Sequence, residues 1–201
     1  GENLAHSVPA AELYAVADPF MNDATRAWAA EMGIEKCYDD PEMIFSDPSI
    51  EAVFICSSTN THAEFIIRAA KAGKHIFCEK PIDTKLDKIR EALDAVEKAG
   101  VKLQVGFVRR FDHNHKAVAD AVKDGTVGDP HIVIVSSRDP EPPPASYVAV
   151  SGGIFYDMMI HDFDILLSLY KSPAAEIHAM GTSIYSKFED VAHVQIRFEC
   201  G

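Results

Sequence analysis

The chain has 201 residues, is 47% hydrophobic and 25% charged, and carries a formal net charge of -12. This is the composition of a globular protein with enough apolar residues for one large or two modest domains. The acidic balance argues against a nucleic-acid-binding surface, which needs a basic patch, so no nucleic-acid partner is expected.

No apolar run approaches the roughly 18 residues that a membrane-spanning helix requires, and we expect no membrane association. The N-terminal sequence GENLAHSVPA lacks the basic start and apolar stretch of a signal peptide. Its four cysteines form no C-x-x-C pair, and three lie in or beside apolar runs. Buried, reduced thiols and a cytoplasmic location are therefore expected.

The first half of the chain alternates between strand and helix patterns. Strands are predicted at 11–18, 52–58, 75–80 and 101–108, and helices at 22–32, 61–73 and 84–99. Strict alternation predicts an α/β domain with a doubly wound parallel sheet, the Rossmann arrangement, over residues 1–106. The continuous apolar run at 52–58 predicts a strand covered on both faces.

The second half has a different pattern and predicts an α+β domain over residues 107–201. Helices are expected at 115–123 and from 151 to about 170, and strands at 131–138, 175–185 and 190–200, with a proline-rich loop at 139–147. Two consecutive strands after a helix predict an open, mainly antiparallel sheet.

Polar residues follow three of the predicted strands of the first half, at the sheet edge where ligands bind in such folds. Asp18 could hydrogen-bond a ribose hydroxyl, and no arginine stands beside it to hold a 2′-phosphate, which favours NAD over NADP. The alternative is an aspartate that caps the next helix. Small polar residues after the second strand could let the backbone approach a cofactor, or could simply form a helix-capping loop: Ser57, Ser58, Thr59, Asn60 and His62.

The tripeptide Glu79-Lys80-Pro81 ends another of these strands. Lys80 could place an ammonium near a hydroxyl whose oxygen gains negative charge during oxidation. Taken alone, the tripeptide is a weak signal, and a surface lysine is the ordinary alternative.

Asp157 and His161 are four residues apart in GGIFYDMMIHDFD. On an α-helix this spacing places both side chains on one face. His161 has a suitable pKa for a general base, and Asp157 could orient it or bind a substrate hydroxyl. The alternatives are a helix cap and a satisfied core histidine. Asp162 and Asp164 are expected to be structural, orienting His161 or capping nearby backbone.

A metal site was weighed against this acid–base interpretation. His113 and His115, with Asp157 and His161, offer nitrogen and oxygen ligands, but their spacing fits no compact metal motif. No metal is predicted.

In chain order, these pieces resemble one family. They are a strand ending in Asp, then SSTNTHAE, AGKHIFCEKP, QVGFVRRFD and SGGIFYDMMIHDFD. The chain is similar over nearly its whole length to the glucose-fructose oxidoreductase, inositol dehydrogenase and rhizopine-catabolism (Gfo/Idh/MocA) family. The loop SRDPEPPPASY resembles the inositol 2-dehydrogenase branch in particular.

The resemblance implies an NAD-dependent dehydrogenase acting on a ring polyol such as myo-inositol. Lys80, Asp157 and His161 match the family's catalytic residues, with His161 as the base. Asp18, Ser58, Asn60, His62 and Glu79 match positions along the cofactor. Arg109 and Tyr147 are further candidates for substrate contact. The resemblance also implies a polyol as the small-molecule partner and a homo-oligomer, either dimer or tetramer.

The family's opening strand and glycine-rich turn have no counterpart in the sequence, which also ends within a strand pattern. We therefore expect an N-terminal domain without its first strand, a partial C-terminal domain, and weak NAD binding by residues 1–201 alone. Two other functions stay open, namely a dehydrogenase of the same family for another sugar or polyol, and a non-catalytic dinucleotide-binding module.

Overall fold

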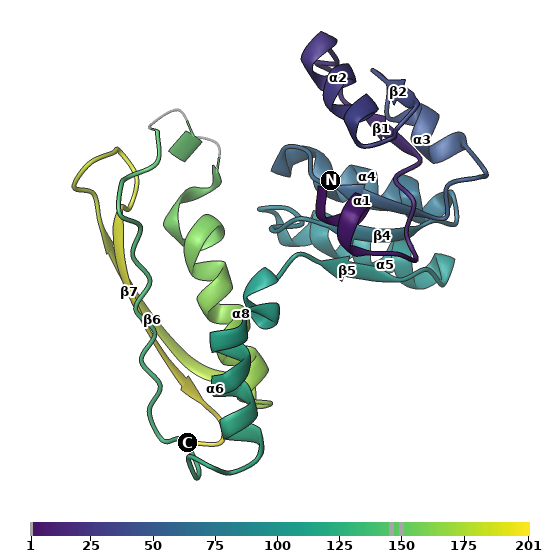
Figure 1. Cartoon of the computed structure of the whole chain (residues 1–201). Helices are drawn as coiled ribbons and strands as arrows, with labels where there is room; N and C mark the ends of the chain where they lie inside the picture. Colours follow the sequence, from purple (N-terminus) through teal and green to yellow (C-terminus); the bar gives the residue numbers. More distant parts are fainter. Residues whose placement is uncertain (1, 145–146, 149–150) are drawn as a thin grey trace. The chain divides into compact units, whose positions relative to one another are not determined.

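The computed structural model describes residues 2–144, 147–148 and 151–201 (Figure 1). It divides into two compact units. The first comprises Gly1–Ser57, Thr61–Cys78 and Leu86–Gln104, and the second comprises Ser58–Asn60, Glu79–Lys85 and Val105–Gly201. The segments Ser58–Asn60 and Glu79–Lys85, which follow two strands of the first unit, thus belong to the second unit. The domain boundary after residue 106 stays a prediction.

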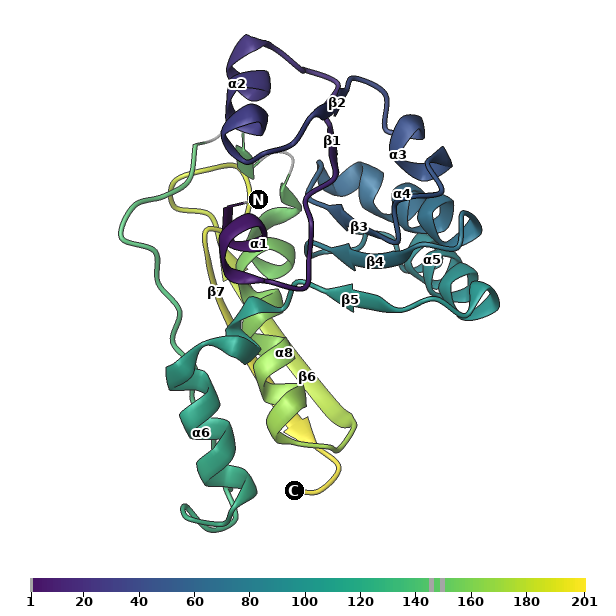
Figure 2. The same ribbon diagram turned by 45° about the vertical axis from the view of Figure 1, so that its right-hand side comes forward.

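The first unit contains short parallel strands. β1 (Ala15–Ala17) pairs in parallel with β2 (Lys36–Tyr38), and β3 (Ala52–Ile55) pairs in parallel with β4 (His75–Cys78). β5 (Leu103–Val105) lies on the other side of β4, and Figure 2 shows these three strands side by side. The β1–β2 pair is not hydrogen-bonded to the β3–β4–β5 sheet. The predicted Rossmann class is confirmed.

One helix precedes β1, and the others connect the strands in chain order. They are α1 (Glu2–Ser7), α2 (Asp23–Glu31), α3 (Glu42–Ser46), α4 (Thr59–Lys71) and α5 (Leu86–Ala99). Asn22 begins α2 by accepting the amides of Ala24 and Thr25 on its side chain. Gly33 follows α2 with φ of +76°, a conformation that glycine adopts without strain.

The core of the first unit lies between α4 and one face of its sheet. Ile66 is fully buried from the helix, and Val53, Ile55 and Ile76 are buried from the strands. Burial alternates along β3, and Phe54 is 50% exposed where it stacks on Phe77. The prediction that this strand is covered on both faces is therefore wrong, because a continuous apolar run does not show which face lacks a covering element.

Other boundaries in the first unit differ from the prediction. α4 begins at Thr59, two residues before the predicted start at 61, so Thr59 and Asn60 lie in the first turn of the helix. β2 and α3 were not predicted, since three- and five-residue elements are too short to show a hydrophobic period.

The second unit is built from helices and one antiparallel hairpin. A 3-10 turn η1 (Val108–Phe111) precedes α6 (His113–Lys123), and a π-helical turn η2 (Phe155–Met159) leads directly into α8 (Ile160–Leu169). β6 (Ala174–Thr182) pairs antiparallel with β7 (Val191–Phe198), which confirms the predicted sheet type.

The strand predicted at 131–138 is wrong. This segment has no regular secondary structure, and Ile132 and Ile134 are 82% and 87% exposed. Its alternating apolar pattern has no partner strand among the described residues, so no ladder forms.

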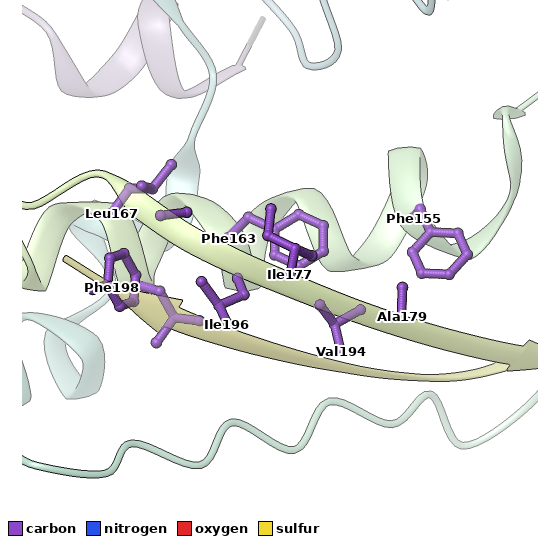
Figure 3. Close-up of a pocket in the computed structure, with 10 residues that line it drawn as sticks. Phe155, Phe163, Leu167, Ile177, Ala179, Val194, Ile196 and Phe198 are labelled. Carbon is purple, nitrogen blue, oxygen red and sulfur yellow. The ribbon is translucent and has the colours of Figure 1, made fainter. Parts of the chain in front are cut away.

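An apolar cavity of about 310 Å³ lies between the η2–α8 helix and the β6–β7 hairpin. Figure 3 shows Phe155, Phe163 and Leu167 on the helix facing Ile177 and Ile196 on the strands. The residues of this helical segment that line the cavity are all apolar, so Asp157, His161, Asp162 and Asp164 of the same segment are not part of its lining.

Of the four cysteines, Cys78 is buried, Cys37 is half-buried, and Cys56 and Cys200 are exposed. The expectation of buried thiols therefore holds for one position and fails for two. Among the described residues, no helix combines the length and apolar character needed to cross a bilayer.

Candidate active site

Lys80 and Asp157 form an ion pair within the second unit. Lys80 Nζ donates to Asp157 Oδ1 at 2.9 Å and to the Asp157 backbone carbonyl at 2.6 Å. Tyr147 Oη donates to the same Oδ1 atom at 3.0 Å. Lys80 follows β4 with a cis peptide bond to Pro81. One oxygen of the Asp157 carboxylate therefore binds both the Lys80 ammonium and the Tyr147 phenol. The carboxylate, the ammonium and the phenol can each hydrogen-bond a polar substrate.

Asp157 lies in the π-helical turn, and His161 lies in the first turn of α8. A π turn interrupts the α-helical period of about 3.6 residues on which the spacing argument rests, and such turns are frequent at functional sites. Upstream, Gly152 has φ of +88°, and a Cβ there would lie 3.0 Å from Tyr156 Cβ. The glycine thus serves the entry into the helix.

His161 is not a satisfied core histidine. Its Nδ1 atom is buried and has no hydrogen-bond partner in the described part of the chain. Burial lowers the pKa of His161, and the positive charges of Lys80 and Arg109 lower it further against the opposing charges of Asp162 and Asp157. The imidazole is therefore neutral at pH 7, the protonation state that a general base needs.

This lowered pKa predicts a pH dependence. Because His161 must be unprotonated to accept a proton, kcat/KM should fall only as the pH drops below the ordinary histidine value of about 6.5. The acidic limb of a kcat/KM profile measured in the full-length protein checks this. A limb at or above the ordinary value would contradict a buried, cation-flanked base.

Two arginines of η1 bind two aspartates of α8. Arg109 Nη1 donates to Asp162 Oδ1 at 2.9 Å, and Arg110 binds both oxygens of Asp164, each at 2.6 Å. Ser137 Oγ also donates to Asp162 Oδ1, at 2.8 Å. Arg110 and Ser137 are functional-site neighbours that the sequence analysis missed. The signals in the sequence are the adjacent Arg109 and Arg110 and the two closely spaced aspartates, Asp162 and Asp164.

Asp18 ends the β1 strand, as predicted. Its Oδ1 accepts the Phe20 amide at 2.8 Å, and Asn22 rather than Asp18 caps α2. The helix-cap alternative for Asp18 is therefore wrong. Among the described residues, the donor to the Asp18 carboxylate is the Phe20 amide, which binds Oδ1. Oδ2 is therefore available to a ligand hydroxyl.

The polar residues after β3 are partly brought together. His62 is 2% exposed, and its Nε2 lies 2.9 Å from the Ser57 carbonyl. Ser57 Oγ lies 2.6 Å from Thr61 Oγ1. Ser58, Thr59 and Asn60 group with the second unit, as Lys80 does.

Glu79 lies against the backbone of Gly106. A Cβ at Gly106 would lie 3.0 Å from Glu79 Oε2, so glycine allows this carboxylate to approach the chain closely. The sequence placed a domain boundary near Gly106 and did not reveal this contact. No group of three or more metal-binding side chains occurs in residues 2–144, 147–148 and 151–201.

The first unit is a parallel α/β unit with polar residues after its strands, a class of fold that binds dinucleotides, and the second is an α+β unit that carries Lys80, Asp157 and His161. Residues 1–107 match the family model of the Gfo/Idh/MocA oxidoreductases, described as an oxidoreductase family with an NAD-binding Rossmann fold, and residues 115–201 match its C-terminal domain. The chain belongs to this family.

Similar proteins include a myo-inositol 2-dehydrogenase of Thermotoga maritima, 43% identical over the whole chain, and an NAD-dependent scyllo-inositol 2-dehydrogenase of Bacillus subtilis, 38% identical over the whole chain. The chain covers 61% and 60% of these proteins, respectively. A crystal structure of scyllo-inositol dehydrogenase from Lactobacillus casei with bound NAD(H) and scyllo-inositol has a TM-score of 0.85 and 28% identity, covering 99% of this chain and 62% of that one.

Proposed function

We propose that the protein containing this chain oxidises a ring polyol, myo-inositol or a related inositol, and transfers the hydride to NAD. The observation that carries the proposal is the ion pair between Lys80 and Asp157, which lies four residues before His161. The Nδ1 atom of His161 is buried without a partner among the described residues, and burial lowers the pKa of His161. The inositol dehydrogenases among the similar proteins support the choice of substrate class.

His161 takes the proton of the reacting hydroxyl in this proposal. Lys80 hydrogen-bonds the reacting oxygen and stabilises its negative charge, and Asp157 holds Lys80 and binds a neighbouring hydroxyl. Arg109 and Tyr147 complete the substrate contacts, Tyr147 through its hydrogen bond to Asp157. A polyol has many hydroxyls and no charge, so short polar side chains suit it better than an arginine clamp.

NAD accepts the hydride when bound. The residues proposed to hold it are Asp18, Ser57, Ser58, Thr59, Asn60, His62, Glu79 and Lys80. Asp18 fits this role because its Oδ2 is available to a ribose hydroxyl, and its position at the end of a parallel strand is where such folds bind the ribose. The hydroxyls of Ser57 and Thr61 support a polar lining at the end of the next strand.

A doubly wound dinucleotide-binding sheet has the order 3-2-1-4-5-6, whereas the strands described here form two separate sheets, β1–β2 and β3–β4–β5. We propose that the family's first strand and its glycine-rich turn lie between these two sheets in the full-length protein. The pyrophosphate-binding backbone would then come from that turn, and residues 1–201 alone should bind NAD weakly.

The remaining features of the proposal concern the cell and the assembly. We propose a cytoplasmic protein that works as a homo-oligomer, a dimer or a tetramer, without nucleic-acid or membrane partners. The family resemblance and the acidic net charge support this description.

The test is NADH formation with myo-inositol by the full-length protein. Turnover supports the inositol dehydrogenase activity. Turnover with other sugars or polyols but none with inositols would replace the substrate and keep the reaction. Tight NAD binding without turnover on any polyol or sugar would favour a dinucleotide-binding module and overturn the proposal.

A further inference from the structure

Two ion pairs with buried carboxylates and partly exposed guanidinium groups join α8 to η1. Asp162 and Asp164 are 6% and 7% exposed, and each is paired with one of the adjacent arginines Arg109 and Arg110. A buried carboxylate that loses its partner is strongly destabilising. Both pairs should therefore contribute to holding α8, and the difference between them lies in what surrounds each pair.

The Asp162 pair has an additional partner and adjoins the proposed base. Ser137 donates to the same Asp162 oxygen that Arg109 binds, and Arg109 Nη1 also donates to Ser137 Oγ at 3.2 Å. Asp162 directly follows His161 in the first turn of α8. Three segments, η1, the extended stretch around Ser137 and α8, are thus connected at the residue next to the imidazole.

Charge distinguishes the two pairs as well. The charges that shift the pKa of His161 come from Lys80 and Arg109, which lower it, and from Asp162 and Asp157, which raise it. Arg110 and Asp164 are not among the largest causes of this shift. Arg109 therefore lowers the pKa of His161 and Asp162 raises it. In the bidentate pair, the charges of Arg110 and Asp164 neutralise each other.

We propose that Asp162 is a positioning residue for His161. Through Arg109 and Ser137 it fixes the turn of α8 that carries the imidazole, and its negative charge offsets the cation of Arg109 at that place. The Arg110–Asp164 pair only holds the helix. The role of Asp162 rests on the proposed function, in which His161 is the base.

The test is the pKa of His161, measured by NMR titration of its imidazole in the full-length protein. The substitution Asp162→Asn keeps the shape of the side chain and removes its charge, so the pKa should fall. Arg109→Gln removes the opposing cation, so the pKa should rise. Each shift should be on the order of one unit, as expected for a nearby charge at the intermediate dielectric of a protein surface.

Asp164→Asn and Arg110→Gln are the matched controls. Asp164 is about as buried as Asp162, so each control should lower the melting temperature by an amount similar to that of the corresponding change at Asp162 or Arg109 and leave the pKa of His161 unchanged. The acidic limb of kcat/KM should move with the pKa in the Asp162 and Arg109 variants alone.

Equal shifts in both sets of variants, or no shift in either, would overturn the proposal. If Asp162→Asn does not fold, the sign for Arg109→Gln decides, because a fall in the pKa contradicts the charge balance. The NMR titration does not need turnover. Opposite pKa shifts in an inactive protein would therefore leave the charge balance standing and show that the proposed function has failed.

Discussion

Replacing His161 with alanine should lower kcat for polyol oxidation about 100- to 10,000-fold, the contribution typical of a general base. NAD affinity should change little, because the residues proposed to bind the cofactor lie at the strand ends and the imidazole acts on the substrate proton. Stopped-flow or steady-state NADH formation, combined with calorimetric titration of NAD, measures both quantities in the full-length protein.

His113→Ala is the matched control for this substitution. The His113 side chain is 88% exposed at the start of α6, so its loss should affect neither rate nor binding. Unchanged turnover in His161→Ala would remove His161 from the mechanism. Loss of NAD binding together with turnover would instead indicate that the substitution damages the fold.

Replacing Lys80 with methionine should lower kcat about 100- to 1,000-fold, the size of effect seen when one donor to a developing oxyanion is removed. The change also leaves the Asp157 carboxylate with Tyr147 as its remaining side-chain donor among the described residues, and it removes the hydrogen bond of Lys80 to the Asp157 carbonyl. The Lys80 side chain is 17% exposed. Its replacement therefore removes a partly desolvated charge, and solvent water substitutes for that charge poorly.

Lys80→Arg should not restore activity. A planar guanidinium cannot occupy the position from which one ammonium reaches both a backbone carbonyl and a carboxylate oxygen of Asp157. Lys85→Met, at an exposed lysine nearby in the sequence, is the control and should keep full turnover. Full activity in Lys80→Arg would show that only the positive charge matters at this position.

The sequence alone was sufficient for the class of fold. Longer elements such as α2 and α5 have a clear hydrophobic period with glycine at their ends, and the antiparallel β6–β7 hairpin follows from two long alternating runs. It failed where a pattern depends on a partner. The segment 131–138 alternates like a strand but pairs with none among the described residues.

The individual candidate residues could also be selected from the sequence, because Lys80, Asp157 and His161 stand in motifs with a recognisable order. Their environment could not. The contact of Lys80 with the Asp157 carbonyl joins positions 77 residues apart, and the π turn that holds Asp157 has no signal in the spacing.

The alternation of elements, the family resemblance and the chemical types at the strand ends could therefore be predicted from the amino-acid sequence. Two features became evident in the folded chain. His161 has a buried nitrogen without a partner among the described residues, and Arg109 and Arg110 bind different aspartates of one helix. The reason is physical. Local patterns reflect periodicity along the chain, whereas burial and charge compensation depend on groups that folding brings together from distant positions.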